Sequence, residues 1–119
     1  MQLKRVVVTG LGALTPIGNN IEEYWNALVN GVSGAAPITH FDAAKFKTRF
    51  ACELKNFTVT DFMNRIDARK MDKFTQYAMV ASDEAIADAN LDLETINKLR
   101  VGVIWGAGIG GLETFQNEV

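Results

Sequence analysis

The stretch VGVIWGAGIGGLETF, residues 101–115, places a short apolar run directly before a loop with glycines at Gly106, Gly108 and Gly111. The β-branched residues of the run predict a strand over Val101–Trp105, and the letters LETFQNEV after the loop predict the start of a helix. The glycine spacing, G-x-G-x-x-G, is also typical of loops that bind the pyrophosphate of a dinucleotide at a helix N-terminus. The stretch therefore indicates an α/β fold and raises nucleotide binding as a first hypothesis.

The dinucleotide fingerprint requires more than three glycines. It also requires an acidic residue about 20 positions further on, and the sequence given ends at Val119, before that position. The fingerprint usually belongs to the first strand–helix turn of a domain. Here that turn is Gly10–Gly18, and Thr15 stands where the third small residue should be. Nucleotide binding therefore rests on spacing alone and stays open as an alternative.

The first half of the chain predicts two strands and a helix. The β-branched run Arg5–Thr9 predicts a strand buried on both faces. Asn20, with Glu23 three residues later, predicts a capped helix start, and Gly31 is the expected residue just after the helix end. The alternation of apolar and polar residues over Phe50–Leu54 predicts a further short strand.

The longest predicted helix begins after Asp72 and runs to about Ala89. Its apolar face is narrow and rich in alanine: Phe74, Tyr77, Ala78, Ala81 and Ala85. Small residues on that face let the helix lie close to a sheet or to another helix. Strands and helices in this order, joined by right-handed crossovers, predict an α/β fold around a largely buried sheet.

Composition narrows the class of protein. The 119 residues fit one domain, with 48% hydrophobic residues, 22% charged residues and a formal net charge of −2. The charge gives no indication of nucleic-acid binding, and no apolar run is long enough to span a membrane. The N-terminus has no signal-peptide pattern and one cysteine forms no internal disulfide, so we expect a cytoplasmic protein. Because the last helix has no ending signal, we also expect the chain to be a piece of a larger one.

A lone cysteine and a lone histidine, Cys52 and His40, raise the hypothesis of a nucleophile pair. A reactive thiolate needs a helix N-terminus or cationic neighbours, and the sequence around Cys52 offers neither clearly. We therefore expect Cys52 to be a buried strand residue and His40 to be a loop residue bonded to local backbone. No His, Cys and carboxylate spacing predicts a metal site.

The sequence contains one local basic cluster, formed by Arg65, Arg69 and Lys70. If this stretch is helical, Arg65 and Arg69 share a face. Three aspartates dilute the positive charge, at positions 61, 67 and 72. Charge counting alone therefore favours a solvated face over a docking patch.

Three segments in order suggest a family: VVVTGLGALTPIGNN (6–20), RKMDKFTQYA (69–78) and VGVIWGAGIGGLETF (101–115). Together they closely resemble the N-terminal part of the type II β-ketoacyl-[acyl-carrier-protein] synthases, condensing enzymes of bacterial fatty acid synthesis. The resemblance runs essentially from end to end. Pro16 and the Gly-Ile-Gly-Gly at 108–111 resemble type II more than type I, while Ala107 stands where the family has Ser or Thr.

The resemblance implies a thiolase-like architecture with five layers, α-β-α-β-α, usually in a homodimer. Residues 1–119 would be the opening part of the N-terminal domain. The implied reaction is a decarboxylative Claisen condensation, in which a cysteine takes the acyl group and two histidines assist decarboxylation. Neither Cys52 nor His40 matches those residues, so no catalytic residue is expected in this segment, and we expect it to be inactive alone.

The resemblance also gives expected roles to two parts of the chain. Ile109, with Gly108 beside it, matches the residue that lines and gates the pocket for the growing acyl chain, so the loop would bind no dinucleotide. Arg65, Arg69 and Lys70 fall where the family docks the acidic helix of acyl carrier protein, although Ile66 replaces an expected lysine. No metal or nicotinamide is implied, because the phosphopantetheine arm is delivered by the carrier protein.

Two other classes remain as alternatives. One is a catalytically inactive partner subunit of the same fold, like the chain-length factors that pair with active synthases. The other is a nucleotide-binding α/β module. The residues beyond 119 would separate the first alternative from an active synthase, and binding of NAD or NADP would support the second.

Overall fold

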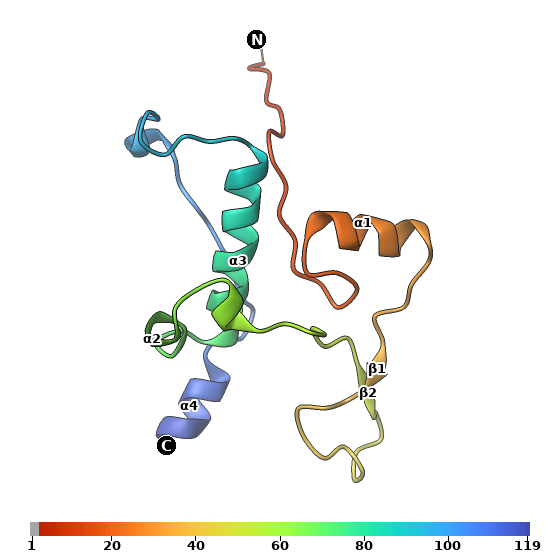
Figure 1. Cartoon of the computed structure of the whole chain (residues 1–119). Coiled ribbons are helices and arrows are strands. Elements are labelled where there is room, and N and C mark those ends of the chain that lie inside the picture. The colour runs from red at the N-terminus through yellow and green to blue at the C-terminus, as the bar shows by residue number, and fades with distance from the viewer. Residues whose placement is uncertain (1–2) are drawn as a thin grey trace. The chain divides into compact units, whose positions relative to one another are not determined.

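The computed structural model describes residues 3–119 and divides into two compact units. One unit contains the residues up to Gly12 together with Val59–Val119, and the other contains Ala13–Thr58. Figure 1 labels their helices and strands. No helix in the described part of the chain is both long enough and apolar enough to cross a membrane.

The unit Ala13–Thr58 contains helix α1, Ile21–Val29. The Asn20 side chain accepts a hydrogen bond from the backbone N–H of Glu23 (2.8 Å), which satisfies one of the free donors at the helix start. The Glu23 carboxylate reaches back to the N–H of Asn19 (2.8 Å), one residue before the cap. After the helix, Gly31 has a φ of +64°, which favours glycine. Both predicted helix boundaries are confirmed.

The same unit contains a two-residue antiparallel ladder, with β1 (Ala36–Pro37) paired to β2 (Phe50–Ala51). The strand predicted over Phe50–Leu54 is thus confined to its first two residues. In an extended ladder Gly34 would lie opposite Glu53. Instead, the Gly34 carbonyl accepts a hydrogen bond from Lys55 Nζ (2.9 Å), so the ladder ends where a side chain replaces the backbone donor.

The other unit is built on two helices, α2 (Arg65–Ala68) and α3 (Lys73–Asp88), with a 3₁₀ turn η1 (Val59–Asp61) before them. Gln76 joins the two helices, because its side-chain amide donates to the carbonyls of Ala68 (2.8 Å) and Met71 (3.1 Å). The buried apolar residues among those described are Ala68, Ala78, Val80 and Ala81. Two of them belong to the predicted stripe of α3, and Val80 lies outside it.

The N-terminal segment lies against α3 at the small residues of that helix. The N–H of Leu11 donates to the Asp88 carboxylate (2.8 Å). A Cβ added to Gly10 would stand only 2.6 Å from the backbone nitrogen of Ala89. The helix face therefore accommodates bare backbone at close range, but the partner is an extended segment and not the expected sheet or helix.

The two main predicted strands, Arg5–Thr9 and Val101–Trp105, are extended but form no sheet within residues 3–119. The second follows a 3₁₀ turn, η2 (Lys98–Arg100). A strand needs a neighbour to satisfy its N–H and C=O groups, and the described residues supply none to either segment. Side chains meant for a core are therefore exposed, such as Val6 (89%) and Ile104 (99%). The prediction of a largely buried sheet is wrong for the described part of the chain.

Candidate functional site

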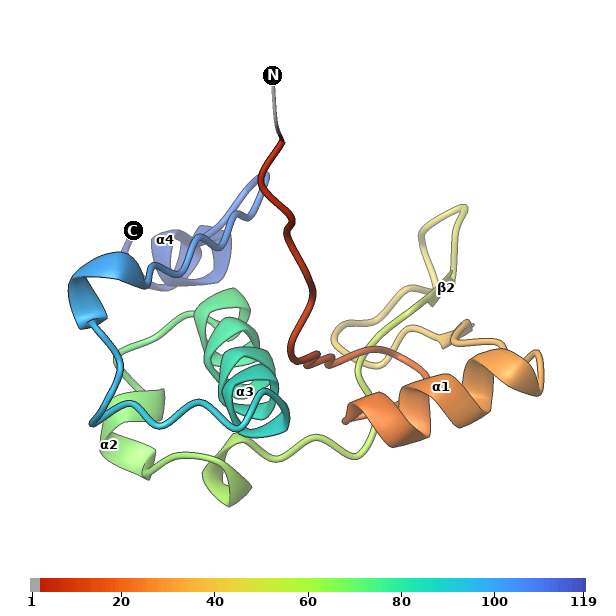
Figure 2. The ribbon, with the colours of Figure 1, turned by 90° about the horizontal axis from the view of Figure 1, so that it is seen from above.

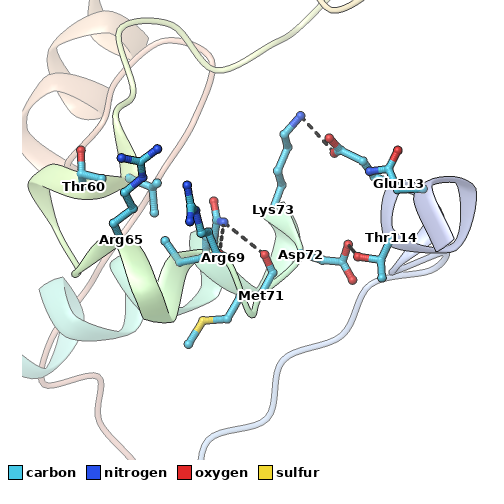
Figure 3. Close-up of a pocket in the computed structure, with 12 residues that line it drawn as sticks. Thr60, Arg65, Arg69, Met71, Asp72, Lys73, Glu113 and Thr114 are labelled. Carbon is cyan, nitrogen blue, oxygen red and sulfur yellow. Dashed lines mark hydrogen bonds and ion pairs between the residues drawn. The ribbon is translucent and has the colours of Figure 1, made fainter.

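An open hollow of about 400 Å³ lies in the unit that contains Val59–Val119, beside the N-terminal end of α3. Figure 1 shows α2 and α4 (Leu112–Glu118) near that lower end of α3, and Figure 2 shows them on different sides of the helix. Figure 3 shows the side chains that line the hollow. Its charged and hydroxyl-bearing lining includes Arg65, Arg69, Asp72, Lys73, Glu113 and Thr114.

The helical wall on one side follows from a local cap. Asn64 accepts a hydrogen bond from the N–H of Asp67 (2.9 Å) and so starts α2 at Arg65. Arg69 follows the helix as its C-terminal cap, four residues after Arg65, and both side chains line the hollow. The prediction that these two arginines share a face is confirmed.

Lys70, the third residue of the predicted basic cluster, is not in the lining of the hollow. Its ammonium lies 3.5 Å from the Asp67 carboxylate, in a pair whose side chains are 69% and 49% exposed. Such exposed pairs contribute little to stability. In contrast, neither Arg65 nor Arg69 forms an ion pair with another residue in the part of the chain that the structure describes. The two arginines are thus the cations available at this surface.

The opposite wall is tied to α3 by two polar contacts. Lys73 Nζ lies 3.0 Å from Glu113 Oε2, and the Thr114 hydroxyl donates to the Asp72 carboxylate at 2.5 Å. Helix α3 begins directly after Asp72, as predicted, but the Asp72 side chain makes no hydrogen bond to its own helix. Sequence reasoning missed this role of Asp72, because an aspartate at this position normally caps the helix that follows.

The glycine loop, Gly106–Gly111, leads to α4 and contains a turn at Gly108 and Ile109. Ile109 is 77% exposed, and a Cβ built on Gly106 or Gly108 would meet no atom within 4 Å. Within the loop Gly106–Gly111, the positions that need glycine are instead the last two, Gly110 and Gly111. A Cβ on Gly110 would stand 2.9 Å from the Phe74 ring, and Gly111 has a φ of +77°. Gly108 and Ile109 lie outside the lining of the hollow.

Cys52 and His40 are both exposed residues of the other unit. The prediction that Cys52 is a buried strand residue is wrong, because β2 ends at Ala51 and the chain leaves the ladder there. His40 lies in a loop as expected, but its neighbour is a carboxylate, with Nε2 3.9 Å from Glu53 Oε1. Hydrogen bonds from Thr39, above all from its side chain, hold the pKa of Glu53 below its ordinary value.

The profile of one protein family, described as "Beta-ketoacyl synthase, N-terminal domain", matches residues 3–119. The match covers all the residues described above, from the N-terminal segment through α4. The chain therefore belongs to the family of β-ketoacyl synthase N-terminal domains, and the resemblance inferred from the three sequence segments is confirmed.

Three similar curated proteins carry the name "3-oxoacyl-[acyl-carrier-protein] synthase 2". The chain is 47% identical to that of Synechocystis sp. over 118 residues, which is 99% of the chain and 28% of the relative. It is 49% identical to the Vibrio harveyi protein over 116 residues, 98% of the chain and 28% of the relative. The Staphylococcus aureus (strain COL) protein gives 49% over 115 residues, 97% and 28%. The chain thus spans about 28% of the length of these relatives.

The solved structures that resemble this one include two ketosynthase structures. The ishigamide ketosynthase/chain length factor superposes with a TM-score of 0.68 at 38% identity, over 74% of this chain and 22% of that chain. A type II polyketide synthase acyl-carrier protein in complex with its ketosynthase, AntDE:AntF, gives a TM-score of 0.62 at 26% identity, over 81% and 25%. The chain therefore has part of the thiolase-like α/β fold of this family, as the resemblance implied.

Proposed function

We propose that this chain is the N-terminal part of a 3-oxoacyl-[acyl-carrier-protein] synthase of type 2. The whole protein would lengthen an acyl group on acyl carrier protein by two carbons, using malonyl carrier protein and releasing carbon dioxide. The observation that carries the proposal is the 47–49% identity to synthases of this name in three organisms, over 97–99% of the chain.

The nucleophile of the condensation would lie in the rest of the whole protein. Cys52 follows β2 on an exposed stretch and not at a helix N-terminus, and His40 is paired with Glu53 on the surface. A low-pKa nucleophilic cysteine is typically found at a helix N-terminus or beside a cationic group, and the exposed stretch after β2 does not place Cys52 at a helix N-terminus. The residues described here would therefore supply binding and positioning, and the chain alone would be inactive.

Two surfaces would take part in binding. The exposed Ile109, with Gly108 beside it, would form part of the wall of the acyl pocket. Arg65 and Arg69, together with Lys70, would dock the acidic helix of acyl carrier protein. The absence of carboxylate partners for the two arginines among the described residues supports this role. The similarity to a ketosynthase in complex with its carrier protein supports it further.

The proposed reaction uses no metal and no nicotinamide cofactor. The thioester substrate would arrive on the phosphopantetheine arm of the carrier protein. The acyl group would pass to a cysteine thiolate and free the carrier thiol; loss of carbon dioxide from the malonyl thioester would then give an enolate that attacks the acyl-cysteine thioester, forms the new C–C bond and releases the cysteine thiolate. We propose a cytoplasmic homodimer as the working form of the whole protein.

A second candidate function is that of a catalytically inactive partner subunit. The similarity to a structure that contains a chain length factor favours it, because such a subunit shares the fold of the active synthase. The two candidates differ in one property of the whole protein. An active synthase needs a cysteine nucleophile and two histidines beyond residue 119, and the alternative predicts that this set is incomplete.

The test is a condensation assay with the whole protein. Acyl carrier protein loaded with a hexanoyl group and malonyl carrier protein are the substrates, and the readouts are carbon dioxide and the mass of the acyl product. We expect a 3-oxoacyl product two carbons longer. Folded whole protein that releases no carbon dioxide and forms no product would overturn the proposal. Residues 1–119 alone serve as the control and should form none.

A further inference from the structure

Three successive residues at the start of α3 contact the segment that joins the glycine loop to α4. The Phe74 ring lies 2.9 Å from the Cβ position of Gly110. One oxygen of Asp72 lies 3.3 Å from the Cβ position of Gly111, and Lys73 lies 3.0 Å from Glu113. Gly110, Gly111 and Glu113 thus each lie next to a residue at the start of α3.

Asp72 has the central place among these contacts. Its second carboxylate oxygen accepts the hydrogen bond of the Thr114 hydroxyl at 2.5 Å. Figure 3 shows the two side chains pointing toward each other from α3 and α4. Hydrogen bonds to an ionised group are about twice as strong as neutral ones. One carboxylate therefore lies against the left-handed turn at Gly111 and also holds the first turn of α4.

Asp72 accepts a hydrogen bond from Thr114 and does not cap its own helix, α3. An aspartate directly before a helix usually accepts a hydrogen bond from an N–H of the first turn, and the Asp72 side chain does not. The first turn of α3 therefore lacks the stabilisation that a side-chain cap would give. The interaction with Thr114 takes the place of a cap and joins two residues that lie 42 positions apart in the sequence.

We propose that Asp72 and Thr114 form a clasp that fixes the position of the loop bearing Gly108 and Ile109. Only Gly110 separates Ile109 from the left-handed turn that the clasp holds. An anchored end restricts the conformations that a short loop can adopt. Resting on the proposed function, the inference is that Asp72 and Thr114 are positioning residues that determine which acyl chain lengths the synthase accepts.

The first test removes the hydroxyl without changing the shape of the side chain. In the whole protein, Thr114→Val deletes the clasp hydrogen bond and Thr114→Ser keeps it. Thr95→Val is the matched control, because it removes a threonine hydroxyl that bonds to the Asp92 carbonyl (3.2 Å) away from the clasp. The readout is amide hydrogen exchange of residues 106–115, which include the Phe115 N–H that donates to the Gly111 carbonyl (2.9 Å). We expect exchange about tenfold faster in Thr114→Val, or about 1.4 kcal/mol, and unchanged in the other two variants.

The second test measures chain-length preference with the same variants. We expect Thr114→Val to change the ratio of kcat/KM for long and short acyl groups by about threefold or more, with Thr114→Ser restoring the wild-type ratio. Unchanged exchange in Thr114→Val overturns the clasp. Faster exchange with a uniform loss over all chain lengths overturns its role in specificity. If the wild-type protein forms no condensation product, the proposed function and the specificity role fail together, and the exchange data still decide whether the clasp exists.

Discussion

The backbone of Gly12 lies directly against the backbone of Ala81 on α3. A Cβ added at Gly12 would overlap the carbonyl oxygen of Ala81 and would stand 2.8 Å from the nitrogen of Ala85. Backbone atoms inside a helix cannot move aside as the end of a flexible side chain can. The contact therefore requires glycine, and it fixes the point where the N-terminal segment meets the helix.

Gly12→Ala should destabilise the whole protein by about 1–3 kcal/mol, because the added methyl forces segment and helix apart. The matched control is Gly102→Ala, since no atom lies within 4 Å of the Cβ position there. Both variants make the same change in the unfolded chain. Chemical denaturation measures the two midpoints. Equal midpoints for the two variants would show that the contact does not constrain the fold.

The helices could be predicted from the sequence because their signals are local. Asn20, Glu23 and Gly31 lie within two turns of the residues that they cap, and the structure places all three at the expected ends of α1. The strands could not, because a strand forms only where a neighbour pairs with it. The β-branched residues around Val6 describe a preference for extended backbone, and the described residues satisfy that preference without a sheet.

The candidate site was predictable only in part for the same reason. The shared face of Arg65 and Arg69 follows from a spacing of four residues in a helix. The clasp follows from no local rule, because the local rule assigns Asp72 to its own helix and Thr114 carries no motif. Two residues so far apart in sequence are brought together by the path of the chain, and only the structure shows that path.

The Glu53 carboxylate should titrate below an ordinary glutamate. It accepts hydrogen bonds from the hydroxyl (2.7 Å) and the N–H (3.0 Å) of Thr39, which favour its ionised form and lower its pKa. A lowered folded-state pKa stabilises the loop above about pH 4.3, the unfolded value. That stability is lost as the pH falls through the lower folded-state value.

Thr39→Val should therefore raise the pKa of Glu53 toward the ordinary value, because the threonine side chain is the largest cause of the shift. His40→Gln should change it less, since it removes only the charge interaction of His40, the smallest cause of the shift, and leaves the hydrogen bond from the His40 backbone N–H. Carboxyl NMR titration of the whole protein measures both. A larger shift in His40→Gln than in Thr39→Val would contradict this ranking.

Residues 1–119 expressed alone should be poorly soluble or molten. Three of the four buried apolar side chains among the described residues are alanines, which bury little area each. Many larger side chains are exposed, and each Å² of apolar surface left in water forgoes about 25 cal/mol. We expect binding of a hydrophobic dye and a broad thermal transition. A sharp cooperative melt of a monomer would contradict this expectation.

Ile109→Phe in the whole protein should shorten the longest acyl group accepted while sparing short primers. The ring would occupy volume that the distal methylenes need, and each buried methylene contributes about 0.8 kcal/mol. Ile109→Val, which removes volume, is the control and should leave long chains accepted. The measurement is kcat/KM over a series of acyl carrier proteins. Uniform loss over all chain lengths in Ile109→Phe would mean that the residue has a structural role.

Docking of the carrier protein should depend on Arg69 more than on Lys70. Arg69 lines the hollow with no ion-pair partner among the described residues. Lys70 lies beside Asp67, whose negative charge partly offsets the positive charge that Lys70 presents to a partner. Charge reversal at Arg69 should therefore raise KM for carrier-bound substrates more than Lys70→Glu does. Each exposed pair contributes only about 0.2–1 kcal/mol, so single effects should be mild and the double reversal larger.

Added salt should shrink the defect of the double variant, because screening weakens both the lost attraction and the new repulsion. The control substrate is a coenzyme A thioester of the same acyl group, which presents no acidic helix to the arginine. It should be used equally well by wild type and variant. If both substrate forms lose activity to the same extent, the basic cluster supports the structure of α2 and does not dock the carrier protein.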